Sequence, residues 1–297
     1  MKHVVSALAI CAAFVGGPAL AADLPVRNAP PPTYYEPAPI AIWTGFYVGL
    51  NAGGTFGGSD NINVTTASLG PGFSPAYGAA GTGTGNSNFG GFIGGGQIGY
   101  NYQFSPAVVA GVEADFQGLA GGGGSSSFSN ASPGVLTPSH IYGGTVASSQ
   151  SLDYLGTVRG RIGYLFTPAF LVYATGGLAY GGTNLSSTFS GNAVNATGMV
   201  INSAFGGASS SNTNIGWTVG GGLEWMFLRN WSAKVEYLYY NLGSNTVGGA
   251  VQSVYTPSGV AGLGANQTSG QFNGHIIRVG VNYHFNWGAP APVVAKY

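Results

Sequence analysis

The sequence predicts an all-β fold, an eight-stranded antiparallel up-and-down transmembrane β-barrel with short periplasmic turns and four long extracellular loops. Eight Lys or Arg and eight Asp or Glu among 297 residues make the chain 5% charged, against about 25% in soluble domains. Hydrophobic residues make up 44% and aromatic residues 13%, which argues against a disordered chain. From Trp43 onward, apolar segments of period two alternate with stretches rich in Gly, Ser, Thr and Asn.

The first element is a secretory signal peptide over residues 1–21. Lys2 and His3 form a short positive start, an apolar run follows, and Ala19 and Ala21 form a small-x-small cleavage site. The apolar run is too short for a membrane-spanning helix.

Cleavage after Ala21 would remove Cys11, the only cysteine, so we expect no disulfide in the mature chain.

Residues 22–42 are rich in proline and are predicted to form an extended periplasmic tether. No later window holds 18 consecutive apolar residues, as a transmembrane helix would require. An exported chain of this kind is either soluble in the periplasm or a closed barrel, because lipid leaves no partner for unpaired backbone groups. We expect the barrel over residues 43–285 and a periplasmic tail over residues 286–297.

The barrel strands are expected where the period-two pattern recurs. Each of the eight segments holds 12 to 16 residues, and a tilted strand needs about 9–11 to cross a bilayer. The segments are 43–56, 89–104, 108–119, 152–166, 170–181, 214–227, 231–242 and 272–285. The connections alternate between three residues and about thirty, a layout that is typical of an outer-membrane barrel. The long connections could be disordered, or could hold short strands that extend the barrel beyond the membrane.

Nine charged residues lie in these segments, and each alternates with the apolar side chains. They are Glu113, Asp115, Asp153, Arg159, Arg161, Glu224, Lys234, Glu236 and Arg278. Arg or Lys on the lipid face costs about 2–4 kcal/mol near the membrane centre, so we place all nine in the interior. Eight strands leave room only for side chains, which favours an ion-pair network over the alternative of a polar route or ligand site.

Aromatic residues gather at the segment ends. Beside the short turns and termini lie Trp43, Tyr102, Phe104, Phe166, Phe170, Phe227, Trp231, Tyr283 and Phe285. Toward the long connections lie Phe56, Phe89, Phe116, Tyr180, Trp217 and Tyr239. Two aromatic girdles that flank an apolar band are expected of a membrane barrel.

Catalysis has little support in the sequence. Glu113 and Asp115 could suggest acid–base chemistry, but Arg159 and Arg161 on the next strand favour charge compensation. We predict no catalytic residue, no metal or cofactor site and no enzymatic activity. The absence of net charge also removes the basic patch that nucleic-acid binding needs.

Two further patterns are rejected as binding sites. The three histidines beyond the signal peptide, His140, His275 and His284, are isolated in the sequence and do not predict a metal site. The GxGxxG pattern at 94–99 matches a dinucleotide fingerprint, but it lies inside a predicted strand with no helix after it.

Five segments resemble the alphaproteobacterial small outer-membrane β-barrel family, which is related in architecture to the transmembrane domain of OmpA. They are WTGFYVGLNAGGTFG (43–57), FTPAFLVYATGGLAYG (166–181), GWTVGGGLEWMF (216–227), WSAKVEYLYYNL (231–242) and HIIRVGVNYHF (275–285). The resemblance implies an eight-stranded barrel in the Gram-negative outer membrane. Val281, Tyr283 and Phe285 resemble the signal read by the barrel-assembly machinery, although family members typically end at the aromatic residue, whereas this chain continues to Tyr297.

The expected function is structural: a barrel that supports envelope integrity and presents surface loops. Expected partners are outer-membrane lipid and lipopolysaccharide. During biogenesis we also expect contact with the barrel-assembly machinery and with periplasmic chaperones. The sequence leaves open whether the chain forms a homo-oligomer. Two alternatives remain, a narrow porin-like channel for small solutes and a loop-mediated surface receptor for hemin, phage or host contact. Hemin has little independent support, because His140 is the one histidine in the long connections.

Overall fold

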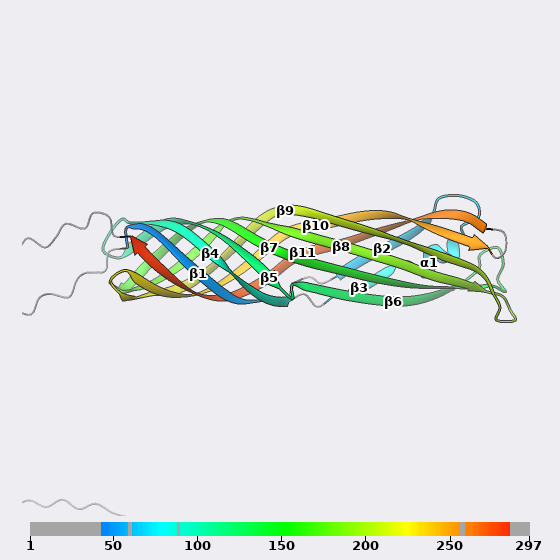
Figure 1. Cartoon of the computed structure of the whole chain (residues 1–297), viewed down its shortest axis with the longest axis horizontal. Helices are drawn as coiled ribbons and strands as arrows, with labels where there is room; N and C mark the ends of the chain where they lie inside the picture. Colours follow the sequence, from blue (N-terminus) through cyan, green and yellow to red (C-terminus); the bar gives the residue numbers. More distant parts are fainter. Residues whose placement is uncertain (1–42, 59–60, 88–89, 256–258, 286–297) are drawn as a thin grey trace, which may run out of the picture. The chain divides into compact units, whose positions relative to one another are not determined.

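The computed structural model describes residues 43–285, apart from 59–60, 88–89 and 256–258. The predicted signal peptide with Ala19 and Ala21, the tether and the tail lie outside the described residues. The described elements are β1 (Gly45–Phe56), β2 (Asn61–Ser68), α1 (Pro75–Ala80), β3 (Gly83–Asn86), β4 (Gly90–Gln103), β5 (Val108–Ala120), β6 (Gly123–Pro133), β7 (Ile141–Thr167), β8 (Phe170–Val194), β9 (Val200–Leu228), β10 (Trp231–Tyr255) and β11 (Gly259–Phe285) (Figure 1). Within the described residues, no helix is long and apolar enough to cross a membrane.

All the named strands belong to one antiparallel sheet. Along it, β1, β4, β5, β7, β8, β9, β10 and β11 each pair with the next. The last strand, β11, also pairs with β1, from Phe46 opposite Phe285 to Phe56 opposite His275. The all-β, antiparallel, up-and-down class predicted from the sequence is confirmed.

The predicted number of strands is wrong, because the described residues form eleven strands rather than eight. Each of the eight predicted segments corresponds to one strand in the ring of pairings. The three additional strands, β2, β3 and β6, lie in regions predicted as loops. Their sequences consist largely of Gly, Ser, Thr and Asn. In β2 the alternation of apolar and polar side chains is limited to Ile62 and Val64, much shorter than the pattern that marked the other eight.

The prediction of four long loops is also wrong. Strands β7 to β11 hold 25 to 29 residues each, about twice the predicted length. The predicted loops 182–213 and 243–271 are mostly strand, and β8 ends at Val194 only a few residues before β9 begins at Val200. The alternative in which these connections hold strands is therefore the correct one.

The sheet has two sections, which we call basal and distal. The basal section contains β1, β4, β5 and residues 154–167, 170–182, 213–228, 231–241 and 273–285 of the five long strands. The distal section contains β2, β3, β6, α1 and the remaining residues of the long strands. At the junction β7 leaves β5 and pairs with β6, while β11 leaves β1 and pairs with β2. The five long strands therefore hold both sections together.

In β7 and β10 the alternation of inward and outward side chains reverses where the two sections meet. The β7–β8 pairing shifts between Leu152 and Tyr154, and the β10–β11 pairing shifts between Asn241 and Ser244. Gly243 has a φ of +78° at the second shift, a conformation that glycine adopts without steric strain. An extra residue of this kind moves all later side chains to the opposite face.

The distal section has its own apolar core around α1. Ser74 caps the helix by accepting the Ala76 N–H. The Tyr77 ring packs at 4.9 Å from Tyr142, and its hydroxyl donates to both oxygens of Asn202 at 3.1 Å. Burial raises the pKa of the Tyr77 hydroxyl, so it remains a neutral donor. The full cluster is Ile62, Val64, Phe73, Ala76, Tyr77, Tyr142, Val146, Phe189, Ala193, Ala204 and Val251.

We expect Tyr77→Phe to loosen the distal section while the basal section stays intact. The variant keeps the ring but leaves the buried Asn202 oxygens without this donor, a loss of about 1 kcal/mol. Amide hydrogen exchange at residues 201–204 should accelerate about fivefold. Tyr102→Phe is the matched control, because the Tyr102 side chain is half exposed. Equal acceleration in both variants would contradict the anchoring role of Tyr77.

Candidate functional site

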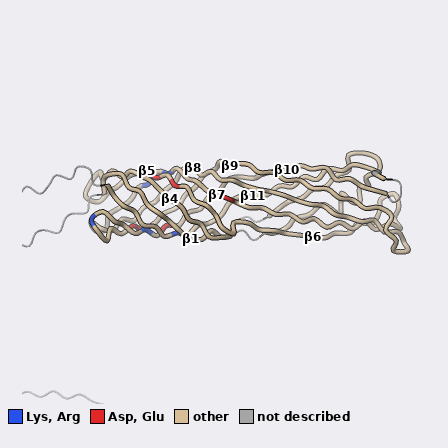
Figure 2. The backbone as a smooth tube through the Cα atoms, in the orientation of Figure 1, with Lys and Arg blue, Asp and Glu red and all other residues tan. Residues whose placement is uncertain are grey.

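Eight charged side chains meet inside the basal section, in what we call the interior ion network. The members are Glu113 and Asp115 on β5, Arg159 and Arg161 on β7, Glu224 on β9, Lys234 and Glu236 on β10, and Arg278 on β11. None is more than 5% exposed. Figure 2 shows the charged residues gathered toward the end of the strands that carries the short turns. Alternation places each side chain on the inward face of its strand.

Two arginines form the centre of the network. Arg159 contacts Glu113, and it also reaches Asp115 Oδ2 at 2.8 Å and Glu236 Oε1 at 3.0 Å. Arg278 Nη2 lies 2.9 Å from the same Asp115 oxygen, and Arg278 Nε donates to Glu236 Oε2 at 2.7 Å. Both guanidinium groups thus link β5 to β10. Arg159 touches both Glu113 and Asp115, as the charge-compensation interpretation expects.

The other two cations extend the network toward the short turns. Lys234 Nζ donates to both oxygens of Glu113 at 3.0 Å. Arg161 Nη2 donates to Glu224 Oε2 at 2.6 Å, and its guanidinium carbon lies 4.0 Å from the centre of the Tyr173 ring. A cation over an aromatic face gains electrostatic stabilisation when both are desolvated.

Neutral groups complete the hydrogen bonds of the carboxylates. Tyr47 donates to Glu113 Oε2 at 2.7 Å and accepts from Arg161 Nη1 at 3.1 Å. Ser232 and Asn282 donate to Glu224 Oε1 at 2.6 and 2.7 Å. These neutral partners were missed in the sequence. Tyr47, Tyr173, Ser232 and Asn282 all occupy inward positions of their strands, so alternation could have identified them.

His284 lies at the end of the network nearest the short turns. Its Nε2 is 3.5 Å from Glu224 Oε1 and 2.9 Å from Ser232 Oγ. The side chain is only 2% exposed, as the alternation along β11 requires of an inward position. His275 lies on the outer face, where its ring stacks at 5.8 Å from Phe56 and its Nδ1 is 2.6 Å from the Tyr237 hydroxyl.

Asp153 does not belong to the network, and its predicted interior position is wrong. It is exposed, and its carboxylate accepts from Asn184 Nδ2 at 2.9 Å. The prediction assumed one unbroken period-two pattern over 152–166. The phase change at this point instead turns Asp153 outward and Leu152 inward, where Leu152 is only 2% exposed. Without Asp153, the network balances four acids with four bases.

Clusters of buried apolar side chains lie on both sides of the network. Toward the short turns lie Trp43, Val109, Leu165, Leu171, Tyr173 and Met226. Toward the distal section lie Ile93, Leu152, Leu155, Ala179, Leu185, Leu238, Tyr240, Leu242, Val247, Phe272 and Ile276. Trp43 was predicted in an aromatic girdle, but it is fully buried in the first cluster and its Nε1 donates to the Pro168 carbonyl at 2.9 Å.

The outer face of the basal section is an apolar band with aromatic residues at both margins. Exposed aliphatic side chains such as Val158, Leu178 and Val279 occupy the band. Ring pairs beside the short turns are Tyr164–Phe166, Trp225–Phe227, Trp231–Tyr283 and Tyr283–Phe285, and pairs at the far margin are Phe56–His275, Phe116–Tyr154 and Trp217–Tyr239. Val281, Tyr283 and Phe285 lie on this face at the end of β11. Phe89 lies outside the described residues.

Each carboxylate of the network contacts at least one cation. Glu113, Asp115 and Glu236 each contact at least two cations, and Glu224 contacts Arg161. These contacts leave the charge of each carboxylate matched by neighbouring cations. In the part of the chain that the structure describes, no group of three or more His, Cys, Asp or Glu side chains could hold a metal ion.

The amino-acid sequence matches the family model described as outer membrane protein beta-barrel domain over residues 7–285. It is 34% identical over 295 residues to the 31 kDa outer-membrane immunogenic protein of Brucella melitensis, an alignment that covers 96% of this chain and all of that protein. It is also 34% identical to the 22 kDa outer membrane protein of Rhizobium leguminosarum bv. viciae over 147 residues, 49% of this chain and 51% of that protein. Among solved structures, OprG from Pseudomonas aeruginosa aligns over 82% of this chain and 97% of its own, with 9% identity and a TM-score of 0.35.

Proposed function

Because the chain belongs to the outer membrane protein β-barrel family and is a Gram-negative outer-membrane protein, we propose that its ring of eight paired strands is a closed transmembrane barrel with a structural, non-catalytic role. The barrel anchors the distal section outside the cell and contributes to the integrity of the envelope.

The apolar band supports this placement in the membrane. Aliphatic side chains between two aromatic margins are the outer surface that a bilayer requires of a barrel. The basal strands are long enough for the purpose, since β1 holds 12 residues and β5 holds 13, and about 9–11 suffice. In this orientation the short turns face the periplasm and the distal section faces the medium. Lipid and lipopolysaccharide then surround the band, and the Val281, Tyr283 and Phe285 ending serves the assembly machinery.

The filled interior is the observation that carries the structural role. A conducting pore needs a continuous path of water, whereas here the ion network lies between two layers of buried apolar side chains. An eight-stranded ring leaves space for little besides side chains. The network then supplies internal cross-links between strands, and its four acids and four bases leave no net charge to attract a solute ion.

Single-channel recording tests this role against the porin-like alternative. Full-length mature protein, purified in its folded form and inserted in planar bilayers, should give no stable conductance steps. A 16-stranded porin in the same bilayers serves as the positive control, because barrels of that size leave an aqueous channel. Reproducible steps from the folded protein, with an amplitude that scales with salt concentration, would overturn the structural role.

A further inference from the structure

The outer face of the distal section differs in chemistry from the apolar band next to it. Four serines lie in one row across β6, β7, β8 and β9, because Ser125 pairs with Ser149, Ser149 with Ser186, and Ser186 with Ser209. Asn184 and Ser211 form part of the neighbouring row. We call these six residues the hydroxyl wall. Alternation directs all six side chains outward.

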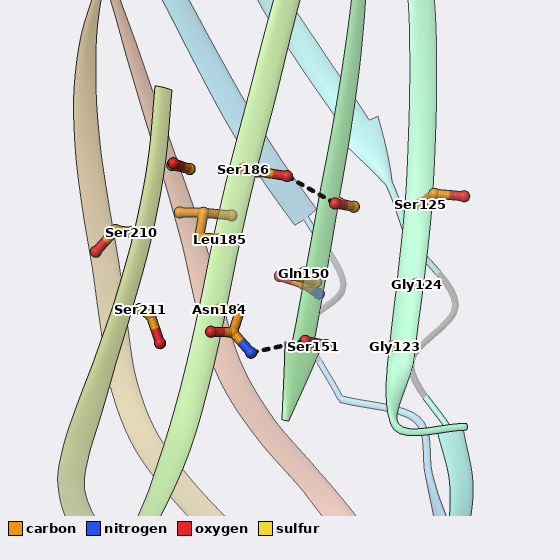
Figure 3. Close-up of a pocket in the computed structure, with 12 residues that line it drawn as sticks. Gly123, Gly124, Ser125, Gln150, Ser151, Asn184, Leu185, Ser186, Ser210 and Ser211 are labelled. Carbon is orange, nitrogen blue, oxygen red and sulfur yellow. Dashed lines mark hydrogen bonds between the residues drawn. The ribbon is translucent and has the colours of Figure 1, made fainter. Parts of the chain in front are cut away.

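All six residues of the hydroxyl wall line one groove, and Figure 3 shows its lining side chains as sticks. Its volume is about 500 Å³, and Gly123 and Gly124 lie at its β6 end. Neighbouring strands lie about 4.8 Å apart, so the row presents a hydroxyl at each strand spacing. Ser149 and Ser186 hydrogen-bond to each other at 2.8 Å, which leaves each hydroxyl with further capacity to bond to a ligand.

The wall lies directly beyond the aromatic margin of the membrane band. Tyr154 stacks on Phe116 at this margin, and its hydroxyl is 2.8 Å from Thr213 Oγ1. Ser149 is five residues further along β7, a distance of about 16 Å along the strand. In a Gram-negative outer leaflet, the layer immediately outside the lipid headgroups contains the sugars of lipopolysaccharide. In the proposed orientation the groove therefore lies beside the layer that contains those sugars.

The charge of the distal outer face indicates which chemical groups of that layer, phosphates or uncharged sugars, it can bind. Asp153 is the one charged side chain on the distal outer face within the residues that the structure describes. Neither a Lys nor an Arg is available there to bind phosphate. Uncharged sugar hydroxyls both donate and accept hydrogen bonds, as serine hydroxyls and the asparagine amide do.

We propose that the hydroxyl wall binds the uncharged core sugars of lipopolysaccharide in the surrounding leaflet through direct hydrogen bonds. The proposal rests on the membrane placement given above. The contact joins the distal section to the leaflet that surrounds the barrel, so the long strands bind sugar where they leave the lipid.

Amide hydrogen exchange of the full-length protein in three kinds of vesicle tests the proposal. One contains phospholipid alone, one adds lipopolysaccharide with a complete core oligosaccharide, and one adds lipopolysaccharide truncated to its acidic inner sugars. Amides of β6 and β8 beside the wall should exchange about tenfold more slowly with the complete core only, and the slowing should persist in EDTA. Equal slowing with truncated lipopolysaccharide, or loss of the slowing in EDTA, would assign the contact to phosphate and bridging cations and would overturn the proposal.

Two triple variants locate the contact. Ser149→Ala/Ser186→Ala/Ser209→Ala should abolish the slowing that the complete core produces. The matched control is Thr246→Ala/Gln267→Ala/Ser269→Ala on the outer face of β10 and β11, which should retain it at β6 and β8. Heat-modifiable migration in each vesicle reports whether the barrel is folded and inserted. Absence of slowing in a folded, inserted protein would reject the sugar contact alone, whereas failure to insert would reject the membrane placement.

Discussion

Replacing Arg159 with leucine is expected to destabilise the folded barrel by about 3–5 kcal/mol, the usual effect of removing one partner from a buried ion pair. Arg159 contacts Glu113, Asp115 and Glu236, and its guanidinium is completely buried. Without it the network holds four carboxylates and three cations. The unbalanced charge lies between apolar layers where water cannot solvate it.

Unfolding by urea in phospholipid vesicles, followed by tryptophan fluorescence, measures this effect. Arg159→Lys should lie between the wild type and Arg159→Leu, because lysine keeps the charge but loses the planar guanidinium that reaches three carboxylates. Arg229→Leu is the matched control, since Arg229 is exposed in the β9–β10 turn, and its effect should stay within about 0.5 kcal/mol. A similar loss in Arg159→Leu and Arg229→Leu would show that the network contributes nothing specific to stability.

The basal section was predictable because lipid imposes a pattern on it. Every outward side chain in the band must be apolar or small, so alternation marks the strands sharply. The segment 108–119 differs from β5 by one residue, and 89–104 differs from β4 by one at each end. The same constraint placed eight charged residues on inward positions. It could not show which cation meets which carboxylate, because that depends on register between strands that are distant in the sequence.

The distal section was not predictable by this means, because both its environment and its outer side chains are polar. In β6 the sequence GGSSSFSNASP has no apolar period, and its strand conformation depends on pairing with β7. The α1 helix has six residues, too few for a helical period to appear. The predicted interior position of Asp153 was wrong for a related reason. The one extra residue that reverses the alternation in β7 leaves no mark in the composition of that strand.

Replacing Val158 with arginine is expected to destabilise the barrel by about 2–4 kcal/mol, the range for a cation on the lipid face near the membrane centre. Val158 is 54% exposed on the outer face of β7, and its cross-strand partners are Ala114 and Leu178. In the proposed orientation this exposed surface is covered by acyl chains. The adjacent Thr157 is unsuitable as a control, because its side chain is 1% exposed in the filled interior and an arginine there would overpack it.

The informative control places arginine at two outward positions of β11, one on each side of the proposed membrane boundary. Val279 and Gln267 both face outward on β11, Val279 in the apolar band and Gln267 in the distal section. Val279→Arg should match Val158→Arg in urea unfolding and should reduce assembly in the outer membrane, whereas Gln267→Arg should behave as the wild type. If Gln267→Arg were as damaging as Val279→Arg, the membrane would have to extend over the distal section. If all three arginine variants were tolerated, the band would face water, and the structural role proposed for the barrel would fail with it.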